Sequence, residues 1–218
     1  MLNNVINNYL SIQQNINKAK LSSPNVEIIS VSKTFQMDKI MPLVLNGNIH
    51  FGENKVQEAD SKWTEVLEKK PQIRLHMIGK LQSNKAKKAL QIFHYIHSLD
   101  SKKLADILSK CENELNKKLS YFIQVNVGNE SQKSGILPNE IDQFYTYCSR
   151  EKNLNIIGLM AIPPNDGNED KHFQFLYEAN ASLGLKELSI GMSADYLIAL
   201  KHSPTFLRIG SSIFGPRS

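Results

Sequence analysis

Short apolar runs alternate with longer amphipathic stretches along almost the whole chain. The apolar runs are rich in β-branched residues, which is typical of strands that are buried on both faces of a sheet. We predict strands over residues 26–33, 49–52, 73–78, 93–99, 121–127, 156–162, 188–192 and 206–209. The stretches between them place apolar residues three and four positions apart, as helices do. We predict helices over residues 37–46, 83–90, 138–149, 170–183 and 193–200. Two more helices are predicted, one that follows residues 53–54 and ends at 69, and one that is capped at residue 100 or 101 and ends at 115.

This alternation predicts the fold class. Apolar strands separated by single helices indicate right-handed βαβ units and therefore a parallel sheet. Eight strands favour a closed (β/α)₈ barrel of the TIM type over a doubly wound open sheet. No Gly-x-Gly-x-x-Gly follows the first strand, which argues against the dinucleotide-binding alternative. No linker or low-complexity tract divides the chain, so we expect one domain over residues 1–218.

The two ends of the chain complete this picture. Residues 2–20 form an extra amphipathic helix at the N-terminus, which the Ser-Pro-Asn sequence at residues 23–25 interrupts. The sequence stops soon after the eighth strand, so we expect no helix there. The N-terminal helix is then expected to cover the gap that a missing eighth helix leaves.

Composition changes this picture little. Hydrophobic residues make up 41% of the 218 residues and the net charge is +5, which permits an anionic ligand without requiring one. The N-terminus lacks the pattern of a signal peptide, and no apolar run approaches the ~20 residues of a membrane span. We therefore expect a soluble cytoplasmic protein without membrane contact. A lysine cluster at residues 80–88 lacks interleaved aromatic residues, so we do not expect nucleic-acid binding.

Lys33 is the first candidate for chemistry, because it ends a buried strand. An ammonium in such a place must be solvated, paired or used chemically. The plain alternative is a lysine whose stem lies along the barrel mouth while its charge reaches water. We interpret Lys33 as the amine that holds an aldehyde cofactor.

An anion site is expected beside Lys33. Active sites of such barrels lie at the C-terminal ends of the strands, and phosphate sites are commonly built by the loops after strands seven and eight. Barrel closure brings strand eight next to strand one, so Ser193, Gly210 and Ser211 should lie near Lys33. Backbone N–H groups and the Ser193 hydroxyl would bind the anion. The alternative is that these residues only form tight turns and a helix cap.

Arg208 lies two residues before Gly210 and so shares its face of the strand. Pointed inward, it could donate a hydrogen bond to a pyridine nitrogen. An arginine keeps its own proton, so that nitrogen would stay unprotonated and the ring would stabilise a carbanion poorly. The histidines show no metal-ligand spacing, and Gly191-Met192-Ser193-Ala194-Asp195 lacks the second glycine of a hydrolase nucleophile elbow.

Seven groups of motifs follow one another along the chain in a defined order and spacing. The motifs are Val31-Ser32-Lys33-Thr34, Phe51-Gly52-Glu53-Asn54 with Val56-Gln57-Glu58, His76-Met77-Ile78-Gly79 with Leu81-Gln82-Ser83-Asn84-Lys85, Ser131-Gln132-Lys133-Ser134-Gly135, Gly158-Leu159-Met160-Ala161-Ile162-Pro163, Ser189-Ile190-Gly191-Met192-Ser193, and Arg208-Ile209-Gly210-Ser211-Ser212-Ile213-Phe214-Gly215. Together they resemble one known family, the pyridoxal phosphate homeostasis proteins, which are single-domain relatives of the alanine racemase N-terminal barrel. The resemblance covers nearly the whole chain.

The resemblance implies roles for individual residues. It implies that Lys33 forms a Schiff base with pyridoxal 5′-phosphate and that Arg208 faces the pyridine nitrogen. It also implies that Asn54 lies beside the ring, and that the phosphate is received by Ser193, Gly210 and Ser211. Lys133 falls in a family motif and is a looser candidate for approaching the cofactor.

The resemblance also implies a function. Members of the family are not known as enzymes. The resemblance implies a carrier or buffer that regulates the cofactor and influences amino-acid and keto-acid balance. Apo-enzymes that need the cofactor would be its recipients, and a monomer is expected. A weak amino-acid racemase or transaminase, with Lys133 or a tyrosine as second base, is the alternative. A regulator that binds RNA or a partner through residues 85–88 is a third class.

Overall fold

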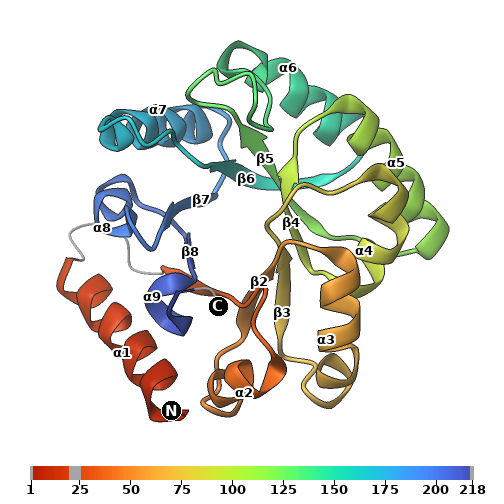
Figure 1. Cartoon of the computed structure of the whole chain (residues 1–218). Coiled ribbons are helices and arrows are strands. Elements are labelled where there is room, and N and C mark those ends of the chain that lie inside the picture. Colours follow the sequence, from red (N-terminus) through yellow and green to blue (C-terminus); the bar gives the residue numbers. More distant parts are fainter. Residues whose placement is uncertain (1, 20–25, 217–218) are drawn as a thin grey trace.

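Eight parallel strands form a closed barrel in this computed structural model, which describes residues 2–19 and 26–216 (Figure 1). Each strand pairs with its sequence neighbours, and β1 pairs with β8 from Glu27 opposite Phe206 to Ser30 opposite Ile209. The predicted (β/α)₈ barrel is therefore confirmed. The strands are β1 (Glu27–Val31), β2 (His50–Glu53), β3 (Arg74–Met77), β4 (Tyr95–Leu99), β5 (Ser120–Val125), β6 (Asn155–Ala161), β7 (Glu187–Met192) and β8 (Phe206–Ile209).

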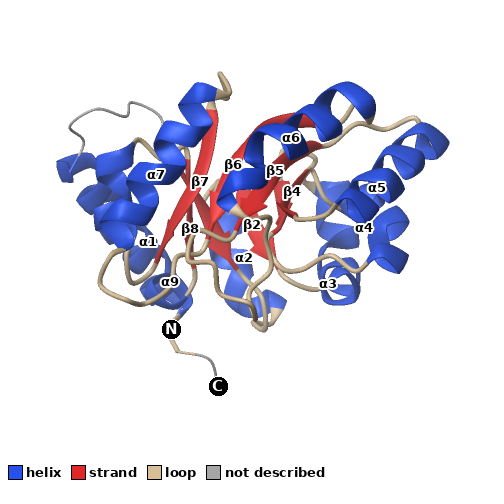
Figure 2. Cartoon of the chain, turned by 90° about the horizontal axis from the view of Figure 1, so that it is seen from above, coloured by secondary structure: helices blue, strands red, loops and turns tan. Residues whose placement is uncertain are grey.

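Helices surround the barrel in Figure 1, and Figure 2 shows the same arrangement from above, after a turn of 90°. The longer ones follow the predicted alternation, and short 3₁₀ or π segments extend several of them. The α-helices are α1 (Leu2–Ala19), α2 (Met37–Leu45), α3 (Val56–Lys69), α4 (Ala86–Ile92), α5 (Lys102–Leu115), α6 (Ile141–Thr146), α7 (Glu169–Ser182), α8 (Tyr196–Ala199) and α9 (Ser211–Phe214). The added segments are the 3₁₀ turns Ser83–Lys85, Pro138–Glu140 and Leu200–His202 and the π-helical turn Tyr147–Glu151.

The helix predicted to begin at Ser193 begins later, at Tyr196. Residues 193–195 form a turn instead, and the Asp195 carboxylate accepts a hydrogen bond from Met192 N–H at 2.5 Å. This bond closes the chain back on the end of β7 before the helix can start. The Ser193 hydroxyl is therefore carried by a turn and does not cap α8, the helix that follows it.

The expectation that no helix follows β8 is wrong, because α9 begins two residues after the strand ends. It has only 4 residues, and α1 lies beside it (Figure 1). The Asn8 side chain of α1 donates a hydrogen bond to the Ile213 carbonyl of α9 at 3.0 Å. The N-terminal helix thus covers the β8 side as expected, together with α9. Residue 20 and the break at residues 23–25 lie outside the described residues.

The apolar core lies mainly between the barrel and its helices, where Trp63, Phe93 and Phe173 are fully buried. The inside of the barrel is different. Phe206 and Phe122 lie there with three buried histidines, and the Phe206 ring is 5.8 Å from that of Phe122. Branched apolar residues usually fill such barrels. Three histidines packed among aromatic rings inside the barrel are therefore an unusual feature of this chain. No helix in the described part of the chain is long and apolar enough to cross a membrane.

Candidate functional site

Lys33 lies in the turn that follows β1 and is half-buried. It lines a cavity of about 290 Å³ at the C-terminal mouth of the barrel, which we call the first cavity. The turns after β7 and β8 line the same cavity. The other lining residues are Val31, Phe35, Ile78, Ile162, Met192, Ser193, Ala194, Arg208, Gly210, Ser211 and Gly215. Lys33, Ser193, Arg208, Gly210 and Ser211 therefore meet at one cavity, as barrel closure predicted.

The turn that carries Lys33 has an unusual backbone conformation. Thr34 adopts φ +68°, a left-handed conformation that costs energy for a residue with a branched Cβ. The N–H group of Thr34 donates to the Glu58 carboxylate at 2.7 Å. Ser32 N–H donates to the Gly52 carbonyl at 3.0 Å, so both sides of Lys33 are tied to neighbouring elements.

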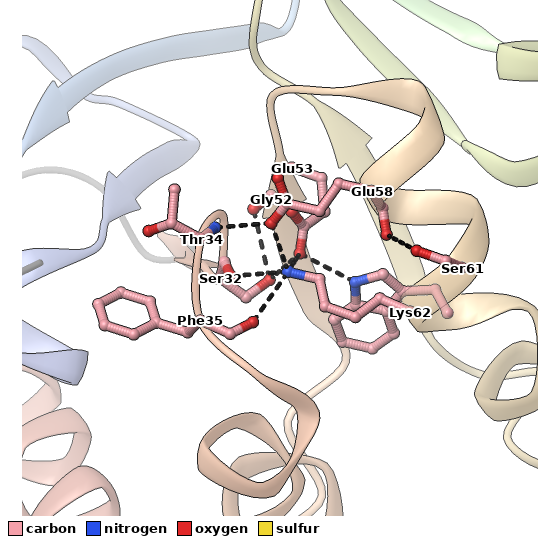
Figure 3. A network of polar contacts seen from close by, with 9 residues as sticks. Ser32, Thr34, Phe35, Gly52, Glu53, Glu58, Ser61 and Lys62 are labelled. Atoms are coloured by element: carbon pink, nitrogen blue, oxygen red, sulfur yellow. Dashed lines mark hydrogen bonds and ion pairs between the residues drawn. The ribbon is translucent and has the colours of Figure 1, made fainter. Parts of the chain in front are cut away.

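Lys62 of α3 supports this turn from behind (Figure 3). Its ammonium donates to the carbonyl oxygens of Ser32 and Phe35 at 3.0 and 3.1 Å and to the Glu58 carboxylate at 3.0 Å. These two carbonyls flank Lys33 and Thr34 in the sequence. Lys62 therefore binds the backbone on both sides of the turn and holds the conformation in which Lys33 faces the cavity.

Glu53 is the buried anion of this network. Its side chain is fully buried, and one carboxylate oxygen lies 2.8 Å from the Lys62 ammonium. The same oxygen accepts hydrogen bonds from the Ser32 hydroxyl at 2.7 Å and from the Trp63 indole at 3.0 Å. Burial alone would raise the pKa of Glu58, but hydrogen bonds from Lys62 and from Thr34 N–H, with the Lys62 charge, lower it. Both carboxylates thus compensate Lys62.

Arg208 is held in a different way, by neutral oxygens. It is 4% exposed, and it donates to the Ser189 carbonyl and hydroxyl, each at 2.6 Å, and to the Ala161 carbonyl at 2.8 Å. Burial lowers the pKa of Arg208 to about 10, against the opposing effect of Asp195. The guanidinium therefore remains charged at neutral pH and faces the first cavity as a fixed cation.

The Ser193 hydroxyl joins the turns after β7 and β8. Its oxygen accepts hydrogen bonds from Gly210 N–H and Ser212 N–H, both at 3.3 Å. A Cβ at position 210 would come within 3.3 Å of the Val31 Cβ, so glycine lets the β8 turn approach β1 closely. Two N–H groups and a hydroxyl thus meet at one edge of the first cavity, where the N–H groups can serve an anion if they exchange the Ser193 oxygen for it.

Asn54 lies at a second cavity and is not among the residues that line the first one. The second cavity, of about 300 Å³, is lined by Lys33, Asn54 and Lys133 together with Ile78, Gly79, Lys80, Gln124, Val125, Asn126, Ser134 and Ile162. Lys133 forms an ion pair with Glu130 and donates to the Pro163 carbonyl at 3.3 Å. Lys33 lies at the junction, because it lines both cavities.

Sequence reasoning missed the network behind Lys33 and the residues beneath Arg208. Glu58 and Lys62 are four residues apart, a spacing at which helical side chains of opposite charge pair, and this signal could have pointed to them. The contacts of Ser189 depend on the register between β7 and β8 and carry no local signal. Among the described residues, no group of histidine, cysteine, aspartate and glutamate could hold a metal ion.

Comparison with known proteins defines the class first. The family model for the alanine racemase N-terminal domain matches residues 8–218. Solved alanine racemases share the fold at low identity: the enzyme of Clostridium difficile superposes with a TM-score of 0.73 at 13% identity over 97% of this chain and 56% of its own. The chain is therefore a member of the alanine racemase N-terminal class of barrels.

More similar relatives narrow the family. The pyridoxal phosphate homeostasis protein of Vibrio cholerae is 37% identical over 95% of this chain and 91% of its own length. The protein of the same name from Schizosaccharomyces pombe is 35% identical over 88% of this chain and 85% of its own length. PipY of Synechococcus elongatus, solved without and with pyridoxal phosphate bound, superposes with TM-scores of 0.87 and 0.84 at 33% and 32% identity, over 97% of this chain and 100% of PipY. This chain belongs to the pyridoxal phosphate homeostasis protein family.

Proposed function

We propose that this protein binds pyridoxal 5′-phosphate in the first cavity and carries or buffers it within the cell. One observation carries the proposal: an amine, a buried guanidinium and a cluster of N–H donors converge on that cavity from β1, β8 and the turn after β7. PipY, which is 32% identical to this chain, has been solved with the same cofactor bound.

The chemistry of these groups fits the cofactor. The Lys33 amine would condense with the aldehyde to form a Schiff base and release one water molecule. The N–H groups of the turns at Ser193, Gly210 and Ser211 would receive the phosphate. Protein oxygens in the described residues take three of the five N–H bonds of Arg208, which leaves donors for a pyridine nitrogen. Asn54, whose side-chain oxygen is buried, would lie beside the ring from the second cavity.

The same cavity favours holding the cofactor over transforming a substrate. Two-sided proton transfer needs a second acid or base across the ring. Among the described residues that line the first cavity, Lys33 is the one lysine, and none is a histidine, carboxylic acid, tyrosine or cysteine. Arg208 keeps its proton at neutral pH, since its pKa stays at about 10. We therefore propose a protein without efficient catalysis.

A spectroscopic titration tests the covalent link. Pyridoxal phosphate added to the purified protein should produce the visible absorption of an imine, and borohydride should then attach the cofactor to the peptide that contains Lys33. The Lys33→Ala variant should show neither result. Lys87→Ala is the matched control, because Lys87 lines neither cavity and its ion pair with Glu114 is exposed, and it should behave as wild type. Wild-type protein without an imine band would refute the proposal.

A transfer assay tests the carrier role. The protein loaded with the cofactor should restore the activity of a pyridoxal-phosphate-dependent apo-enzyme, and the borohydride-reduced protein should not, because its cofactor cannot leave. If the apo-enzyme stays inactive with the loaded protein as well as with the reduced protein, the carrier role is contradicted. Interconversion of L- and D-alanine that Lys33→Ala abolishes would support a weak racemase instead.

We further propose that the chain acts as a cytoplasmic monomer of one domain. Cys111 and Cys148 are both free and buried, which suits a reducing compartment. Analytical ultracentrifugation tests the oligomeric state, and a sedimenting mass near 24.7 kDa is expected. A mass of twice that value would contradict the monomer.

A further inference from the structure

A chain of hydrogen bonds runs through the inside of the barrel from Arg208 to its opposite mouth. Arg208 donates to the Ser189 hydroxyl at 2.6 Å, and Ser189 Oγ lies 2.9 Å from His97 Nδ1. His97 Nε2 is 2.9 Å from His76 Nδ1, and His76 Nε2 is 2.9 Å from His50 Nδ1. His50 lines a cavity of about 200 Å³ at the N-terminal mouth, so the chain spans the barrel.

The Arg208 end gives the chain a direction. A guanidinium can only donate, so Ser189 Oγ must accept its N–H bond. The Ser189 hydroxyl hydrogen is then available to His97 Nδ1, its other neighbour. If His97 Nδ1 accepts, the neutral ring carries its hydrogen on Nε2 and donates to His76 Nδ1. By the same step His76 Nε2 donates to His50 Nδ1.

The opposite end favours the same direction. His50 Nε2 lies 4.0 Å from a carboxylate oxygen of Glu27, which suits a hydrogen on that nitrogen. In the reversed order, His97 Nδ1 would donate to Ser189, and the hydroxyl hydrogen of Ser189 would have no acceptor among the described contacts. Ser189 is fully buried, so that unmade hydrogen bond would carry a desolvation cost. The nitrogen of His50 that faces Glu27 would also then present a lone pair to the carboxylate.

Aromatic stacking holds the rings in place. The His76 ring lies 4.3 Å from the Tyr95 ring with an interplanar angle of 4°, and the His97 ring lies 4.3 Å from Phe122 at 18°. Both histidines are fully buried, and burial lowers their pKa values well below the usual range. Each ring is therefore neutral with a single N–H group, and close packing prevents it from turning over.

We propose that His50, His76 and His97 all carry their hydrogen on Nε2 and form a one-way chain that orients Ser189, which in turn fixes Arg208 toward the first cavity. Ser189 and the histidines are thus positioning residues. The direction of these hydrogen bonds is inferred from contacts within the protein alone. The expected effect on cofactor binding rests on the proposed function.

Nitrogen NMR of the ligand-free protein tests the order directly. In protein with ¹⁵N-labelled histidine at neutral pH, His50, His76 and His97 should each show a protonated Nε2 and an unprotonated Nδ1. Assignment can use one histidine-to-glutamine variant for each ring. A protonated Nδ1 in any of the three would overturn the one-way chain. This measurement needs no cofactor, so its result does not depend on the proposed function.

The second test removes the link between the histidines and Arg208. In Ser189→Ala, the Nδ1 resonance of His97 should shift because it loses its donor, and the dissociation constant for pyridoxal phosphate should rise about tenfold, as the loss of one well-placed charged hydrogen bond predicts. Ser98→Ala is the control, since its buried hydroxyl lies next to His97 in sequence and makes no hydrogen bond in the described structure. The control should leave both values unchanged.

The outcomes separate the two proposals. An unchanged His97 resonance or an unchanged affinity in Ser189→Ala would overturn the positioning role. Wild-type protein that binds no pyridoxal phosphate would overturn the proposed function, while the histidine spectra would still decide the order of the chain. If Ser189→Ala fails to fold, the wild-type spectra still supply the decisive result.

Discussion

Two buried polar networks lie behind the first cavity, and they hold its two cationic side chains in opposite ways. The turn of Lys33 is held by Lys62, which is paired with the buried Glu53 at 2.8 Å and with Glu58 at 3.0 Å. Arg208 is held by neutral oxygens of Ser189 and Ala161. One network balances charge against charge, and the other surrounds a single charge with dipoles.

The difference teaches where each network is vulnerable. Removing one partner of a buried ion pair leaves the other charge uncompensated, which is strongly destabilising. Removing one neutral hydrogen-bond partner of Arg208 weakens the orientation of its guanidinium but leaves no buried carboxylate without a cation. We therefore expect substitutions behind Lys33 to affect stability most, and substitutions beneath Arg208 to affect mainly the geometry of the cavity.

Lys62→Met should produce the largest effect. It keeps the length of the side chain and leaves Glu53 buried without a cation, so the free energy of unfolding should fall by about 3–5 kcal/mol in urea titrations. Lys69→Met is the matched control, because Lys69 is on the same helix and its pair with Glu65 is 75% and 85% exposed. The control should change stability by less than about 0.5 kcal/mol. Equal effects of both substitutions would contradict the comparison.

Acid should weaken the barrel interior in a defined pH range. Burial, with the charges of Arg74 and His94, lowers the pKa of His50 from 6.5 to about 4. Between those values the unfolded chain binds a proton that the folded chain does not, so stability falls as pH falls, by about 1.4 kcal/mol per pH unit for this group. We expect the unfolding free energy, measured by urea titration at pH values from 7 to 4, to fall less steeply with falling pH in His50→Gln than in wild type. An identical slope would argue against a neutral His50.

Arg208→Lys should have an intermediate effect. A lysine keeps the charge but cannot reach the Ser189 and Ala161 oxygens with a planar fork. We expect a loss of about 1–3 kcal/mol in unfolding free energy, from hydrogen bonds to a charged group, and weaker binding of pyridoxal phosphate. The exposed Arg150 provides the control, and Arg150→Lys should match wild type in both measurements. Unchanged binding in Arg208→Lys would show that the planar fork is unnecessary.

Glu58→Gln should have the smallest effect. Glutamine keeps an oxygen that can accept from Thr34 N–H, and the Glu58 side chain is 27% exposed. Loss of its charge should therefore lower the unfolding free energy by no more than about 1 kcal/mol. The imine band of Lys33 should form as in wild type. A loss comparable to that of Lys62→Met would show that Glu58, and not Glu53, is the main partner of Lys62.

Much of the fold was predictable because its signals are local. Strand β8 was predicted with its observed bounds, Phe206–Ile209, since an apolar run between two turns defines it. Helix boundaries were less accurate, as at Ser193, because the Asp195 side chain closes a turn that periodicity does not reveal. The helix α9 was missed because 4 residues are too few to show helical periodicity.

The sequence by itself determined the barrel and the meeting of Lys33, Ser193, Arg208 and Gly210 at one mouth, because strand order and closure follow from eight apolar runs. Only the tertiary structure decided what lies behind them. The pairing of Lys62 with Glu53 and the row of His50, His76 and His97 depend on the register between parallel strands and on how helix α3 packs. Register joins His50 to His76 and His76 to His97, which lie 26 and 21 positions apart, and local patterns of apolar and polar residues do not encode such contacts.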